Sequence, residues 1–136
     1  MKVFVDTNVW LAGRFGRGLC ADLLDTLASD ELLVILLDPR VYAEFRRIAR
    51  DKFAVDAQTL DEADVFFQRY VVVVAAADQP TPGIPDPDDA WIIGAALAAR
   101  TDLFVTGDKA LLALGTVEEM PMVDPRTAYV RLRGLA

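Results

Sequence analysis

The stretch KVFVDTN, residues 2–8, decides how the fold of this chain is interpreted. Its first half is apolar and β-forming, which predicts a short buried strand at residues 2–5. Asp6 follows this strand directly, and a helix containing Val9, Trp10 and Leu11 is expected next. A buried strand that leads at once into a helix is typical of α/β sheets, in which functional side chains gather outside the carboxyl ends of the strands.

The same alternation of strand and helix continues along the chain. Apolar runs predict further strands at residues 32–37, 70–75 and 103–105, and an edge strand at 122–123. Capping residues and apolar spacing predict helices at residues 19–28, 39–51, 59–67, 87–100 and 109–114. We therefore expect an α/β fold with a central parallel sheet of four to five strands and helices on both faces, in a single domain over residues 1–136.

The composition limits the chemistry of the chain. Histidine is absent, which excludes Ser-His-Asp and Cys-His catalysis and the commoner zinc sites. Cys20 is the only cysteine and cannot form an internal disulfide, and no apolar run approaches the roughly 20 residues of a membrane span. The N-terminus also lacks the features of a signal peptide. We therefore expect a cytoplasmic protein without a membrane segment.

Charge and apolar content bear on the partners of the chain. A net charge of −7 argues against generic binding to nucleic-acid backbones. It does not exclude a nuclease, because local arginines and a bound metal can reverse the potential within one cleft. The apolar content of 54% leaves apolar surface to spare, which favours a dimer or a tightly bound partner.

Four carboxylates lie where the chain changes element. Asp6 and Asp108 follow predicted strands, Asp89 opens a predicted helix, and Glu44 lies in an apolar helical stripe. Acids that converge at one edge of a sheet repel one another and raise each other's pKa values unless a cation joins them. We therefore predict a site for Mg²⁺ or Mn²⁺ and hydrolysis of phosphodiester bonds.

Each acid also has a purely structural explanation. Asp6, Asp89 and Asp108 could merely cap the helices that follow them. Glu44 could form a buried salt bridge to a basic residue of another element. The joint placement of the four acids supports the metal site more strongly than any one of them.

Other polar residues lie beside these acids. Thr7, Asn8 and Thr106 offer oxygen or nitrogen atoms near the predicted metal, although such residues usually act as helix caps. Asp86 and Asp88 are secondary candidates for the site. A basic cluster could contact phosphates, with a solvated helix face as the simpler explanation; it consists of Arg46, Arg47, Arg50 and Lys52.

Four blocks of sequence together resemble the PIN-domain ribonucleases, particularly the VapC-like toxins of bacterial type II toxin–antitoxin pairs. The blocks are VFVDTNVW at 3–10, YAEFRR at 42–47, DPDDAWIIGAA at 86–96 and VTGDKALL at 105–112. Each block alone is weak evidence for this family. Their order, and a similarity that spans nearly the whole chain, make the resemblance specific.

The resemblance implies a PIN-like fold and an endoribonuclease that depends on one or two Mg²⁺ or Mn²⁺ ions. It also implies an antitoxin partner and frequent homodimers. The acidic quartet of the family falls on Asp6, Glu44, Asp89 and Asp108, so we expect an active enzyme. Asp6 and Asp89 are expected as direct ligands, whereas Asp108 and Glu44 could be ligands, water-orienting groups or a general base. Asp86 matches an additional acid found in a subset of the family.

Other classes of protein remain as alternatives. A phosphoacceptor receiver domain also has a metal-holding acidic pocket, and Thr106 and Lys109 could belong to one, but receivers place paired acids after the first strand. A haloacid-dehalogenase-like phosphatase would need an aspartate where Asn8 stands. A catalytically inactive PIN scaffold is a third possibility. Metal-dependent cleavage of RNA separates the nuclease from all of these.

Overall fold

The predicted first strand lies in the interior of the sheet. In the computed structural model, which describes residues 1–134, β1 (Lys2–Val5) pairs in parallel with β2 (Val34–Leu37) on one side and β4 (Leu103–Val105) on the other. Phe4 is fully buried and stacks on Phe104 of the neighbouring strand, with 5.0 Å between the ring centroids. Strands buried on both faces read as continuous apolar runs, which explains why the sequence reveals β1 so clearly.

The sheet of the described residues has six strands in the order β3-β2-β1-β4-β6-β5. The outer strands are β3 (Val71–Val73) at one end, and β6 (Met120–Val123) followed by β5 (Thr116–Val117) at the other. All neighbours are parallel except β5 and β6, which form an antiparallel hairpin. The predicted α/β class with a mostly parallel sheet is confirmed. The expected four to five strands were too few, because β5 was not predicted.

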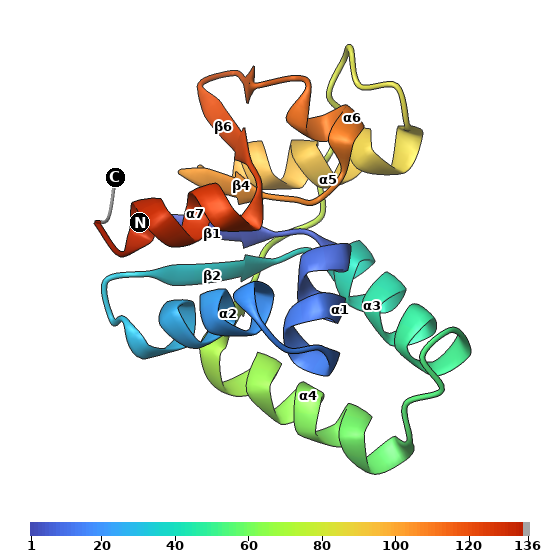
Figure 1. Ribbon diagram of the computed structural model, residues 1–136. Coiled ribbons are helices and arrows are strands. Elements are labelled where there is room, and N and C mark those ends of the chain that lie inside the picture. Colours follow the sequence, from blue (N-terminus) through green and yellow to red (C-terminus); the bar gives the residue numbers. More distant parts are fainter. Residues whose placement is uncertain (135–136) are drawn as a thin grey trace.

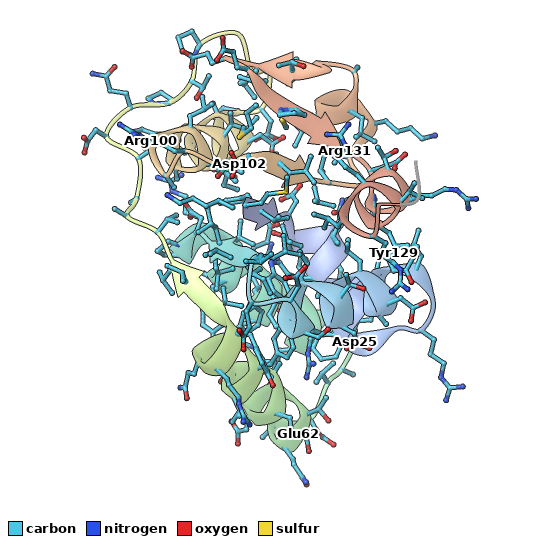
Figure 2. All side chains as sticks on the ribbon, turned by 90° about the vertical axis from the view of Figure 1, so that its left-hand side faces the viewer. Asp25, Glu62, Arg100, Asp102, Tyr129 and Arg131 are labelled. Atoms are coloured by element: carbon cyan, nitrogen blue, oxygen red, sulfur yellow. The ribbon has the colours of Figure 1, made fainter. Side chains whose placement is uncertain are left out.

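Helices cover both faces of this sheet. Within residues 1–134 they are α1 (Thr7–Phe15), α2 (Leu19–Ser29), α3 (Pro39–Asp51), α4 (Ala57–Tyr70), α5 (Pro87–Ala98), α6 (Lys109–Leu112) and α7 (Pro125–Leu132). Figure 1 shows α2 and α7 in front of the sheet and α5 behind it. Figure 2 agrees: α5, which ends near Arg100, lies on one side, and α7 with Tyr129 and Arg131 lies on the other.

A cluster of aromatic side chains fixes α1, α3 and α4 to one another. Trp10 of α1 is fully buried, and its ring lies 4.6 Å from that of Phe67 in α4. Phe45 of α3 contacts the same Phe67 edge-on, with centroids 5.2 Å apart. Large aromatic rings contribute much buried area in few residues, so this cluster holds α3 firmly beside the sheet. The position of α3 matters because Glu44 lies on it.

Some predicted boundaries were wrong. Helix α4 begins after Asp56, whose carboxylate accepts from the amide of Thr59 at 2.8 Å, so Thr59 lies inside the helix and is not its cap. The run at 70–75 gives only β3, because Tyr70 still belongs to α4. Residues 122–123 lie in the longer strand β6, which is interior to the sheet. Helix α7 was not predicted.

Two further expectations concern the extent of the chain and membranes. The single domain was predicted over residues 1–136, of which 135–136 lie outside the described residues. Among the described helices, none has both the length and the apolar character needed to cross a bilayer.

Candidate active site

All four predicted acids line one cleft at the carboxyl ends of the strands. The cleft has a volume of about 230 Å³. Its described lining consists of Asp6, Thr7, Asn8, Leu11, Glu44, Ile48, Asp86, Asp89 and Asp108. Residues from α1, α3 and the starts of α5 and α6 therefore meet beside the end of β1, where ligands of open α/β sheets bind.

Asp6 is the most deeply buried acid of the cleft. Its side chain is the N-cap of α1, with Oδ1 accepting the amide of Thr7 at 2.9 Å, and the residue is only 8% exposed. The Asp6 amide donates to the carbonyl of Val105 at 2.9 Å, which ties the ends of β1 and β4 together. The capping explanation is therefore correct for Asp6, but a cap that lines the cleft keeps lone pairs free for a ligand.

Thr106 connects Asp6 to Asp108. Its buried hydroxyl donates to Asp6 Oδ2 at 2.8 Å and accepts the amide of Asp108 at 3.1 Å. Asp108 itself caps α6, with Oδ1 accepting the amide of Ala110 at 2.8 Å. Asn8 Oδ1 accepts the amide of Gly107 at 3.3 Å. Thr106 and Asn8 thus act here as fixed hydrogen-bond partners that join the end of β4 to the start of α1.

Glu44 reaches the cleft from α3. The residue is half-buried, between the fully buried Val41 and Phe45 on the same helix. Among the ion pairs of the described residues, none involves Glu44, so the alternative of a structural salt bridge is wrong. A half-buried carboxylate without a basic partner is costly, and a bound cation would remove that cost.

The acids at the start of α5 have different surroundings. Asp86 is the N-cap, accepting the amide of Asp88 at 2.8 Å, and it also lines the cleft. Asp89 faces the cleft and is half-buried. Asp88 is 84% exposed and lies 4.0 Å from a guanidinium nitrogen of Arg40, outside the cleft lining. Of the two secondary candidates, the structure therefore places Asp86, and not Asp88, with the quartet.

The carboxylates of the cleft disturb one another's protonation. Burial raises the pKa of Asp89 to about 6, and the charges of Asp86, Asp6, Asp108 and Glu44 add to this effect. Burial also raises the pKa of Asp6, although the hydrogen bonds from Thr106 and Thr7 oppose the rise. The described residues that line the cleft include no lysine or arginine. The cleft therefore has an excess of negative charge that a divalent cation would neutralise.

The donor set fits a hard cation. Oxygen atoms of carboxylates are the ligands that Mg²⁺ and Mn²⁺ prefer. The hydroxyl of Thr7 lines the same cleft, is buried, and has no hydrogen-bond partner among the described residues, which leaves it free for a ligand or its water. No three acidic side chains of residues 1–134 already form a closed metal-binding group. Binding of an ion would therefore require the side chains of the cleft to turn toward it.

The predicted RNA-contacting arginines lie outside this cleft. Arg46 forms an ion pair with Asp64 of α4, and the hydroxyl of Tyr42 donates to the same carboxylate. Arg50 lies 3.4 Å from Asp51, and Arg47 is exposed on the outer face of α3. Their contact with RNA stays a prediction.

A second cleft was not predicted from the sequence. It has a volume of about 490 Å³ and is lined by apolar side chains such as Leu37, Phe67 and Val71, together with Tyr42 and Asp64. It borders β3, the open edge of the sheet. The side chains that form it come from β2, β3, α3 and α4, so no local pattern in the sequence indicates it.

Comparisons with known proteins bear on the family and the fold of the chain. A family model described as PIN domain matches residues 2–110. The fold is similar to that of a chain in the crystal structure of VapBC2 from Rickettsia felis bound to a DNA fragment from their promoter. The TM-score is 0.63 at 16% sequence identity, and the match covers 91% of this chain and 98% of that one. A search of curated proteins found no significant match.

Proposed function

The chain belongs to the PIN-domain family, and from this premise we propose that it is a metal-dependent endoribonuclease that hydrolyses RNA phosphodiester bonds in the acidic cleft. The observation that carries the proposal is the meeting of Asp6, Glu44, Asp89 and Asp108 in one cleft. A purely structural role for these acids would leave several carboxylates facing one another without a cation, which is unfavourable.

The roles of the residues follow from their positions. Mg²⁺ or Mn²⁺, as one or two ions, would supply an activated water and stabilise the negative charge that develops on the phosphate. Asp6 and Asp89 would hold the ion, since both line the cleft and Asp6 is its most deeply buried carboxylate. Glu44 and Asp108 complete the set as ligands or water-orienting groups. Thr106 keeps the Asp6 carboxylate in one orientation through its hydrogen bond.

The alternatives receive less support. A receiver domain would need a phosphoacceptor aspartate in the pocket. The acid that follows the second strand, Asp38, is only 1% exposed and caps α3 through the amide of Arg40. Lys109 is exposed and does not line the cleft. An inactive scaffold has the same fold as an active enzyme, so only an activity measurement separates these two.

The test is cleavage of a structured RNA pool by the purified chain with Mn²⁺ or Mg²⁺, and with EDTA. We expect cleavage only with metal, and a loss of at least about 100-fold in Asp6→Asn and in Asp89→Asn. Asp61→Asn is the matched control, because Asp61 is an exposed acid on α4. Cleavage that persists in EDTA or in Asp6→Asn contradicts the proposal. A folded protein that binds Mn²⁺ but cuts no RNA favours the inactive scaffold.

We further propose that the chain is a cytoplasmic toxin with an antitoxin protein as its partner. The support is the likeness of fold to a chain of VapBC2 over nearly the full length of both. Controlled expression in a bacterial host is the test: growth should stop with the native chain and continue with Asp6→Asn. Unchanged growth, in cells whose extracts contain active nuclease, contradicts the role as a toxin.

A further inference from the structure

One arginine joins the two helices that bring Glu44 and Asp89 to the cleft. The guanidinium carbon of Arg40, in the first turn of α3, lies 5.0 Å from the ring centroid of Trp91 in α5. Its Nη1 atom lies 4.0 Å from Asp88 Oδ1. Arg40 is one helical turn before Glu44 on the same face of α3, and Asp88 directly precedes Asp89. Arg40 and Trp91 do not themselves line the acidic cleft, but each lies on a helix close to a residue that does, so the pair borders the cleft at its rim.

The contacts of Arg40 leave most of its hydrogen-bonding capacity unused. Within residues 1–134 its guanidinium makes this single ion pair and no hydrogen bond, and its side chain is 47% exposed. An ion pair at 4.0 Å with a solvated carboxylate is weak, because water and salt screen it. The indole of Trp91 covers one side of the guanidinium group. With almost half of the side chain exposed, N–H groups of the guanidinium can still reach a ligand.

An RNA strand that approaches the cleft needs such a group. The carboxylates repel the phosphates of the strand, and a guanidinium edge matches a phosphate with two parallel hydrogen bonds. Guanidinium planes and aromatic rings also stack on unpaired bases. We propose that Arg40 and Trp91 form a nucleotide-binding subsite of the cleft, in which Arg40 binds an RNA phosphate and the Arg40–Trp91 stack supports an unpaired base. This subsite rests on the proposed ribonuclease function.

The two tryptophans of the chain provide a direct test by fluorescence. Trp10 is fully buried in the aromatic cluster, whereas Trp91 is half-buried at the rim. The probe is a mixed pool of single-stranded RNA of about 12 nucleotides, added in EDTA so that no cleavage occurs. We expect saturable quenching in the native chain, and no change in the remaining fluorescence of Trp91→Phe when RNA is added.

Substitution of Arg40 then distinguishes a specific contact between Arg40 and RNA from a general effect of the net charge of the protein on RNA binding. In Arg40→Ala, binding measured by anisotropy of labelled RNA should weaken roughly tenfold, and the slope of log K against log salt should fall by about 0.7. Arg133→Ala is the matched control, since Arg133 also stacks on an aromatic ring, 5.2 Å from the centroid of Tyr129, but at the C-terminal end of α7. Thermal unfolding of each variant shows whether the fold is intact.

Each outcome has a defined meaning. Weaker binding in Arg40→Ala but not in Arg133→Ala supports the subsite. The subsite is overturned if the native chain and Arg40→Ala bind RNA equally well, or if Arg40→Ala and Arg133→Ala lose the same amount of RNA affinity. The ribonuclease proposal then still stands if the native chain cleaves RNA. Absence of both RNA binding and RNA cleavage in the native chain overturns the proposed function and the subsite together.

Discussion

The hydroxyl of Thr106 donates a hydrogen bond of 2.8 Å to Asp6 Oδ2 across the ends of two neighbouring strands. Since burial raises the pKa of Asp6 and this hydrogen bond lowers it, Thr106 controls how much of the carboxylate is ionised at a given pH. A residue that does not line the cleft can thus favour ionisation of the deepest acid of the cleft.

We predict that Thr106→Val destabilises the protein and weakens metal binding. Removing a donor from a buried carboxylate should lower the free energy of unfolding by about 1–3 kcal/mol at neutral pH. The folded-state pKa of Asp6 is already above its unfolded value, so ionised Asp6 opposes folding as pH rises. The difference in the free energy of unfolding between the native chain and Thr106→Val, measured by urea unfolding, should therefore grow as the pH rises. Thr106→Ser keeps the hydroxyl and should restore most of the loss; equal stability of the valine and serine variants would contradict the role.

A second prediction concerns the metal-free protein and Asp89. Its pKa is about 6 in the fold against 3.8 when unfolded, so between these values the folded state binds more protons. In EDTA, stability should therefore fall as pH rises from about 4 to 6, and stay low above that range. Asp89→Asn removes this cost, and its melting temperature should exceed that of the native chain at pH 7.5 but not at pH 4.

The same melting temperatures measured with Mn²⁺ in place of EDTA test whether the cleft binds a cation. The native chain should gain more in melting temperature than Asp89→Asn, because a ligand that binds only the folded state stabilises it more the more tightly it binds. Asp61→Asn should behave as the native chain in both arms. A flat pH dependence that Asp89→Asn leaves unchanged would show that the acids of the cleft do not repel one another as described.

Gly94 gives a third prediction, which concerns the loop before Asp86. A Cβ at this position would lie 2.8 Å from the carbonyl oxygen of Gln79 and 3.2 Å from Ala77 Cβ, so the loop packs directly on α5. Gly94→Ala should lower the free energy of unfolding by about 1–3 kcal/mol although alanine favours helices, because backbone must move to make room. It should also reduce cleavage, since the displaced loop leads to Asp86. Gly107→Ala is the control for stability, with ordinary contacts of 3.5 Å or more.

Much of the site could be predicted because its signals are local. Asp6 and Asp108 each follow a short buried strand and precede a helix, and parallel strands bring such positions to one edge. Glu44 was visible as a charge inside an apolar stripe. An aspartate followed by proline begins both α3, at residues 38–39, and α5, at residues 86–87. The same pair precedes α7 at Asp124 and Pro125, so the sequence does carry a signal for α7.

Other features depend on contacts between distant segments. In the sequence, Arg40 and Trp91 each resemble an ordinary residue near the start of a helix, and only the packing of α3 near α5 makes them a pair. Strand β6 contains Pro121, which weakens a strand signal. The four valines at 71–74 indicate a buried strand, yet β3 is an edge strand with Val72 52% and Val73 62% exposed. An apolar run in a sequence does not distinguish an interior strand from an open edge.

This open edge leads to a prediction about association. Beyond β3 no strand of the described residues covers the sheet, and residues 70–77 carry no charge. Two copies with a net charge of −7 each repel one another over most of their surfaces, so an uncharged edge is where they can meet. Antiparallel pairing of β3 with its copy across a two-fold axis would satisfy the free backbone groups of both edges.

We therefore predict that the chain forms a homodimer through β3. Sedimentation velocity should show a dimer at micromolar concentration for the native chain and a monomer for Val73→Lys, since a lysine on an edge strand opposes pairing with another strand. Val65→Lys is the matched control, because Val65 is similarly exposed, at 59%, but lies on α4, and it should leave the dimer intact. A native chain that stays monomeric would contradict the homodimer. A dimer that survives Val73→Lys with unchanged affinity would show that the two copies contact each other at a surface other than β3. Cleavage of RNA by the monomeric variant would then show whether each acidic cleft works on its own, as the assembly of all four acids within one chain leads us to expect.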